Sequence, residues 1–272
     1  MSRTVGTTSE PLSFTAVGPR SAATCVLLHG VGTSGWMWRA LIDDLSKDFH
    51  VLTPDLPGHG ASNRRPWRSM ADTVAAVGAL ISGHAQNGSA HVVGLSLGGY
   101  VGLDLAAAHP DLVPSATVSG VNVLPFPRPR LMRAAGRAMS PLMTTGVMLR
   151  ANARALGVPP EDFAGYAEAA KSMAPGTFLA VGEELMTYSV PAAAARSTTR
   201  VLALAGSQEQ SLIRESLSPI AAAFPQGAAR LVPEAGHGWN GQLPDLFAAT
   251  VRAHISGSPL PAQLHPAVPP SP

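Results

Sequence analysis

The fold of this 272-residue chain is decided by one short stretch, GLSLGG at residues 94–99. An apolar run over residues 91–95 predicts a buried strand before the serine, and residues 97–108 predict a helix directly after it. A serine at such a junction sits on a sharp, strained turn that holds its hydroxyl above the edge of the sheet. The stretch therefore predicts Ser96 as a nucleophile, with the Leu97 N–H placed to face an oxyanion.

Strands and helices alternate on both sides of this stretch. Short apolar runs predict further strands, and runs with apolar residues at helical spacing separate them. This alternation is typical of a mostly parallel central sheet flanked by helices, so we expect the α/β class. The predicted strands cover residues 25–29, 50–53, 91–95, 116–118, 201–205 and 229–232, and the predicted helices cover residues 38–47, 71–81, 97–108, 212–223 and 243–254.

Residues 123–195 break the alternation. This segment is rich in Ala, Met, Arg and Pro, with helical stretches and no clear strand. We therefore expect a helical cap inserted between two strands of a core that comprises residues 1–122 and 196–256. Six prolines fall within residues 257–272, which predicts a disordered tail there.

Composition narrows the classes of function. Hydrophobic residues make up 46% of the chain and charged residues 13%, which favours a compact globular protein. Basic residues outnumber acidic ones only by 19 to 17, and the arginine clusters lack interleaved aromatic residues, so we expect no nucleic-acid partner. Cys25 is the only cysteine, and no histidines or carboxylates cluster at ligand spacing, so we expect no disulfide, no metal site and no cofactor. Without a long apolar run or a signal-peptide pattern, we expect a cytoplasmic monomer or homodimer with no membrane partner.

Two more motifs follow the first two predicted strands. The turn HGVG at residues 29–32 follows the first strand, and the loop DLPGHGAS at residues 55–62 follows the second. Together with the serine stretch, these motifs make the chain resemble the α/β-hydrolase family over residues 12–255. The resemblance implies the α/β-hydrolase fold, and it implies the Val31 N–H as a second oxyanion donor beside that of Leu97.

A histidine base and an acid should complete a triad in the chain order serine, acid, histidine. His237 follows the last predicted strand within GHGW, where flanking glycines let its ring reach the nucleophile. The acid is predicted at Glu209, in the loop after the strand before the last, although the family that the chain resembles usually has Asp there. Glu215 stays open as an alternative acid, and Asn122, at the other position that some members use, carries no charge.

These residues predict two-step acyl transfer through an acyl-enzyme on a small-molecule substrate. Carboxylic esters are the first expected substrates, followed by lactones and thioesters, and the methionines of the cap favour a small, largely apolar molecule. Two alternatives stay open: a carbon–carbon hydrolase of ring-cleavage diketones, which shares the fold and a stretch similar to residues 31–36, and a non-catalytic ligand-binding protein. The residues expected to bind the substrate are His29, Gly30, Trp239, Met132 and Met143.

Overall fold

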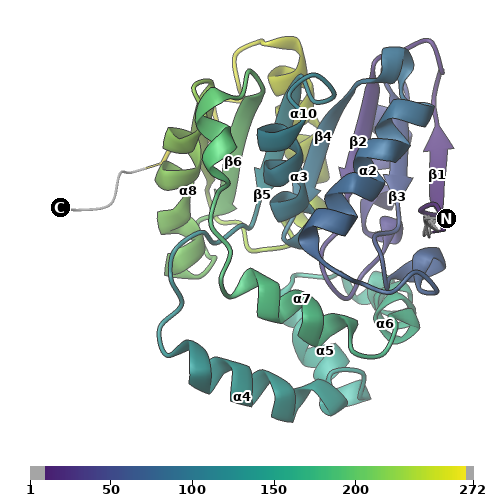
Figure 1. The fold of residues 1–272 in the computed structure, drawn as a ribbon, viewed down its shortest axis with the longest axis vertical. Helices are drawn as coiled ribbons and strands as arrows, with labels where there is room; N and C mark the ends of the chain where they lie inside the picture. The colour runs from purple at the N-terminus through teal and green to yellow at the C-terminus, as the bar shows by residue number, and fades with distance from the viewer. Residues whose placement is uncertain (1–9, 268–272) are drawn as a thin grey trace, which may run out of the picture.

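The computed structural model describes residues 10–267, which are built around one eight-stranded sheet with strand order β1-β3-β2-β4-β5-β6-β7-β8 (Figure 1). The six strands from β2 to β7 pair in parallel, and the edge strands β1 and β8 run antiparallel to their neighbours. The strands are β1 (Phe14–Val17), β2 (Thr24–Leu28), β3 (His50–Pro54), β4 (Ala90–Leu95), β5 (Ser115–Ser119), β6 (Arg200–Gly206), β7 (Gly227–Val232) and β8 (His265–Pro266).

The central strands are buried on both faces. On β2, Val26 and Leu28 join the hydrophobic cluster under α2, α3 and α8, whereas Cys25 and Leu27 join the cluster under α1 and α10. Alternate side chains of a strand point to opposite faces, so a continuous apolar run needs a helical layer on each side. Figure 1 shows α2, α3 and α8 in front of the sheet and α10 behind it. The helices of the core are α1 (Arg39–Leu45), α2 (Met70–His84), α3 (Leu97–Ala108), α8 (Ser211–Ala223), α9 (Trp239–Gln242) and α10 (Pro244–Ser256).

The predicted fold class is confirmed: the sheet is mostly parallel, helices flank it, and a helical cap is inserted between two strands. The six predicted strands correspond to β2 through β7. The sequence gives little sign of β1, because this short edge strand is largely exposed and has no apolar run. Edge strands that face solvent carry weak hydrophobic patterns, so they are easily overlooked.

The prediction of a disordered tail from residue 257 is wrong for residues 257–267. Leu264 is buried in the core cluster beside α10, and β8 pairs with β7, where His265 lies opposite Leu231. A proline has no N–H to donate, but an edge strand tolerates it, so proline content alone does not exclude pairing here. Residues 268–272, the rest of the predicted tail, lie outside the described residues.

The cap leaves the core after β5 and returns to it at β6, and in Figure 1 it lies against one end of the sheet with α4 farthest out. A small hydrophobic cluster that includes Leu149 and Tyr166 holds α5 against α6. The Glu184 carboxylate accepts hydrogen bonds from the Trp67 Nε1–H (2.9 Å) and the Met70 N–H (3.1 Å), which fastens α7 to the core. The cap helices are α4 (Pro129–Met139), α5 (Gly146–Ala155), α6 (Phe163–Ser172) and α7 (Thr177–Leu185).

Over residues 10–267, the helices all fall short of the length or hydropathy that crossing a bilayer requires.

Candidate active site

Ser96 stands on the sharp turn between β4 and α3, with φ 54° and ψ −119°. Residues other than glycine rarely adopt these backbone angles, so the turn stores backbone strain at the predicted nucleophile. The neighbouring glycines are needed because the chain is so tightly packed here. A Cβ at Gly94 would lie 2.1 Å from the Gly98 carbonyl oxygen, and one at Gly98 would lie 2.0 Å from the Leu28 carbonyl oxygen. The turn is therefore held by the sheet and the helix together.

The two predicted oxyanion donors lie on loops that are joined by a backbone hydrogen bond. The Gly98 N–H donates to the His29 carbonyl at 3.0 Å, which ties the start of α3 to the turn after β2. Val31 is in that turn, and Leu97 is the first residue of α3. Within residues 10–267, neither the Val31 N–H nor the Leu97 N–H donates a hydrogen bond to another protein group. Both N–H groups are therefore free to bind an oxyanion beside Ser96.

His237 and Glu209 form a short contact on the loops after β7 and β6. The His237 Nδ1 lies 2.6 Å from Glu209 Oε2, and the Gly206 N–H donates to Glu209 Oε1 at 3.0 Å. The Glu209 side chain is only 1% exposed, so water does not compete for these contacts. A carboxylate at Nδ1 keeps the proton on that nitrogen and leaves Nε2 as an acceptor, which is the tautomer that a general base requires.

Within residues 10–267, neither alternative position for the acid contacts His237. Glu215 is exposed on α8. Asn122 is buried, and its side-chain oxygen accepts hydrogen bonds from the Leu124 N–H and the Ser216 hydroxyl. The geometry thus favours Glu209 over both.

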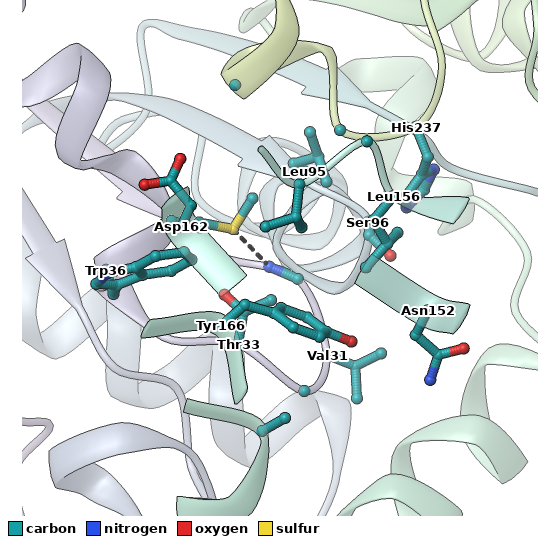
Figure 2. Close-up of a pocket in the computed structure, with 18 of the residues that line it drawn as sticks. Val31, Thr33, Trp36, Leu95, Ser96, Asn152, Leu156, Asp162, Tyr166 and His237 are labelled. Atoms are coloured by element: carbon teal, nitrogen blue, oxygen red, sulfur yellow. Dashed lines mark hydrogen bonds between the residues drawn. The ribbon is translucent and has the colours of Figure 1, made fainter. Parts of the chain in front are cut away.

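The site opens onto a cavity of about 320 Å³ that lies between the core and the cap. Ser96 and His237 lie beside each other in its wall in Figure 2, and Gly30, Val31 and Met143 also line it. Most of the remaining wall is apolar, with side chains from α5 and α6 opposite the carboxyl end of β4. A cavity of this kind fits a small, largely apolar molecule.

His29 was expected to bind the substrate, but its side chain is completely buried behind the turn and does not line the cavity. Its Nε2 accepts a hydrogen bond from the Leu56 N–H (2.9 Å), and its Nδ1–H donates to the Gly30 carbonyl (2.8 Å). Burial lowers the pKa of His29 to about 4, so the ring is neutral at neutral pH. His29 therefore supports, from behind, the turn that contains Gly30 and Val31.

Trp239 and Met132 also lie away from the cavity, contrary to expectation. Trp239 is completely buried in the core, where its Nε1–H donates to the Ser119 hydroxyl (2.8 Å) and its ring packs against Phe247. A buried tryptophan needs a partner for its indole N–H, and the Ser119 hydroxyl is that partner here. Met132 is 40% exposed on α4, which has no buried residue and stands clear of the cavity.

Several residues of the cavity wall were not identified from the sequence. Asp162 of the cap forms an ion pair with Arg39 of the core, and the Arg39 guanidinium lies 4.0 Å from the centre of the Trp36 ring. Tyr166 and Asn152 line the cavity from the cap. Only Trp36 falls in a stretch singled out by sequence, residues 31–36, and its role there was not predicted. The cap residues Asn152, Asp162 and Tyr166 are far from Ser96 in the sequence, and only the tertiary structure places them in the cavity wall.

The fold and this site are those of a hydrolase, with a serine on a strained turn between a strand and a helix and a histidine in contact with a carboxylate. The profile of the Alpha/beta hydrolase family matches residues 25–250, and the chain belongs to this family.

Similar proteins include one of Gibberella zeae named as an AB hydrolase superfamily protein, which is 40% identical over 99 residues; the match covers 36% of this chain and only 35% of the relative. A protein of Pseudomonas syringae pv. syringae that carries the provisional name carbamate hydrolase RutD is 29% identical over 262 residues, which cover 90% of this chain and 98% of the relative. The solved structure of a thermophilic esterase from Thermogutta terrifontis superposes with a TM-score of 0.73 at 20% identity, covering 90% of this chain and 93% of the esterase. That structural likeness concerns the fold.

Proposed function

We propose that the protein is a serine hydrolase that cleaves carboxylic esters of small, largely apolar substrates through an acyl-enzyme. The observation that carries this proposal is the Glu209–His237 contact at 2.6 Å, since His237 lines the same cavity as Ser96, which stands on its strained turn. An activated serine needs a base within reach and a group that orients the base, and these three residues supply those roles.

The reaction has two steps of the same kind. His237 Nε2 takes the proton of the Ser96 hydroxyl while Oγ attacks the ester carbonyl, and the Val31 and Leu97 N–H groups bind the oxyanion. When the tetrahedral intermediate collapses, the ester C–O bond breaks and His237 gives the proton to the leaving alcohol. A water molecule, deprotonated by His237, then attacks the acyl-enzyme, and the acid leaves as Ser96 regains its proton.

The relatives favour ester-like carbonyl substrates and add one further candidate. The esterase from Thermogutta terrifontis supports ester hydrolysis on this scaffold. The relative named as a carbamate hydrolase matches over nearly its full length, so a carbamate is the second candidate substrate. Its carbonyl is attacked by the same nucleophile, but nitrogen donation makes it less electrophilic than an ester carbonyl.

The test combines active-site labelling with turnover. The purified protein should react with a fluorophosphonate and should hydrolyse p-nitrophenyl esters of short acyl chains, and a matched p-nitrophenyl carbamate should turn over more slowly. Labelling without turnover of any ester, thioester, lactone or carbamate would contradict the proposal and would favour a diketone hydrolase or a ligand-binding protein. A folded protein that is not labelled would contradict the assignment of Ser96.

A further inference from the structure

The polar side chains that the cap contributes to the cavity wall include two that lie on neighbouring helices. Tyr166 on α6 and Asn152 on α5 both line the cavity. Throughout residues 10–267, no hydrogen bond to another protein group involves the Tyr166 hydroxyl or the Asn152 side-chain amide. Both groups are open to the cavity, so a ligand that displaces water from them must supply hydrogen-bond partners of its own or lose binding free energy.

The Tyr166 hydroxyl is held in place by its ring. Only 6% of Tyr166 is exposed, and the ring packs in the cap cluster with Leu149 and Ala153. Burial raises the pKa of the hydroxyl, so it stays a neutral O–H donor at neutral pH. Figure 2 shows the hydroxyl directed toward the side of the cavity where Asn152 lies. A clamped donor of this kind is preorganised for a ligand, which reduces the entropy lost on binding.

The position of this pair relative to the nucleophile indicates which part of the substrate it meets. The leaving alcohol must lie beside His237, because that residue protonates it. In the view of Figure 2, Tyr166 and His237 lie on opposite sides of Ser96. An acyl part that points away from His237 would run along the cavity wall that Tyr166 and Asn152 share with Ser96.

We propose that Tyr166 and Asn152 form a polar subsite for a secondary amide carried on the acyl chain of the substrate. The Tyr166 O–H donates to the amide carbonyl, and the Asn152 side-chain oxygen accepts from the amide N–H. A purely alkyl chain would strip water from both groups and give nothing in return, which costs binding free energy. This inference rests on the proposed ester hydrolysis and narrows it to acylamino esters.

The test uses two esters with acyl chains of equal length. p-Nitrophenyl N-acetylglycinate carries an amide where p-nitrophenyl pentanoate carries methylenes. Tyr166→Phe removes one hydroxyl and keeps the ring, so kcat/KM for the amide ester should fall about 3- to 10-fold, the range for one lost hydrogen bond. The value for the pentanoate should stay within about two-fold, and Asn152→Leu should show the same contrast. Comparing each variant with wild type cancels the different intrinsic reactivities of the two esters.

Tyr188→Phe is the matched control, because it deletes the same atom elsewhere. The Tyr188 hydroxyl donates to Asp104 at 2.7 Å and does not line the cavity, so this variant should leave the ratio between the two esters at its wild-type value. If Tyr166→Phe lowers the values for both esters equally, or for neither, the ring only packs the cap and the subsite is refuted.

A binding measurement keeps this result separate from the fate of the proposed function. In a Ser96→Ala background, calorimetry with N-acetylglycine methyl ester and methyl pentanoate needs no turnover. Adding Tyr166→Phe should weaken binding of the amide ester by the same factor and should leave the pentanoate unchanged. If the wild type hydrolyses neither ester but this contrast appears, ester hydrolysis fails and the amide subsite stands. If the contrast is absent, the subsite is wrong whatever the enzyme hydrolyses.

Discussion

Glu209→Gln removes one charge from the active site and leaves the size of the side chain unchanged. The Glu209 carboxylate has two fixed contacts, the Gly206 N–H on one oxygen and the His237 Nδ1–H on the other. In the glutamine variant the amide oxygen should keep the Gly206 N–H, because the alternative places two donors face to face. The amide NH₂ then faces His237 Nδ1, which must accept. The ring proton moves to Nε2, the atom that should take the proton of Ser96.

The size of the effect follows from this tautomer and from burial. The corresponding change of acid to amide in a serine protease costs about 10⁴ in rate, which is about 5.4 kcal/mol at 1.36 kcal/mol per tenfold change. The Glu209 side chain is 1% exposed, so water has no access to restore the working tautomer. We therefore expect Glu209→Gln to lower kcat/KM for p-nitrophenyl esters by roughly 10³- to 10⁴-fold.

The assay is ester turnover on variants whose folding has been checked by thermal unfolding. Glu209→Asp keeps the charge and should retain more activity than the glutamine variant if the loop after β6 can move inward. Glu215→Gln is the matched control, since Glu215 is exposed on α8, and it should be nearly silent. Wild-type activity in a well-folded Glu209→Gln variant would refute the reasoning, and the acid would have to be sought elsewhere.

Three further perturbations test other parts of the structure. Ser96→Ala should abolish fluorophosphonate labelling and lower ester turnover by roughly 10⁴- to 10⁶-fold while the protein stays folded; labelling that persists would contradict the assignment. Truncation after Ser256 removes the buried Leu264 and the strand that pairs with β7. By analogy with emptied core sites, the free energy of unfolding should drop by about 2–5 kcal/mol, so the melting temperature should fall by several degrees. An unchanged melting temperature would show that residues 257–267 contribute nothing to stability. Burial lowers the pKa of His29 from 6.5 to about 4, so between these values the unfolded chain binds a proton that the folded chain does not. The free energy of unfolding should therefore fall as the pH is lowered from 6.5 toward 4, by about 1.4 kcal/mol per pH unit for this group. Equal urea midpoints at pH 7 and pH 5 would contradict this expectation.

Local patterns were enough to predict the parallel sheet and the sharp turn at Ser96, and chain order pointed to His237, which lines the same cavity. Strands buried on both faces are continuous apolar runs, and a strand, a tight turn and a helix are neighbours in the chain, so their signal is contiguous. Glu209 was predictable in position from chain order, but its role depended on whether the loop reaches His237. The contact at 2.6 Å joins two loops, and the hydrogen bond between Asn122 and Ser216 joins the segment after β5 to α8, so both depend on segments that meet only in the folded protein.

Sequence proximity misled where side chains that are adjacent in the chain face different ways. Trp239 follows His237 by two residues, yet it packs into the core while the histidine faces the cavity. Leu264 lies among prolines and is nevertheless buried.

The sequence alone thus determined the fold class, the nucleophile turn and the candidate base, because each depends on residues that are close together along the chain. The tertiary structure alone decided the shape and polarity of the cavity. Tyr166 and Asn152 come from separate cap helices, and nothing periodic in the chain marks them. They line one cavity with Ser96 and His237 only because the cap packs over the core. Burial and orientation of a side chain are properties of the packed structure.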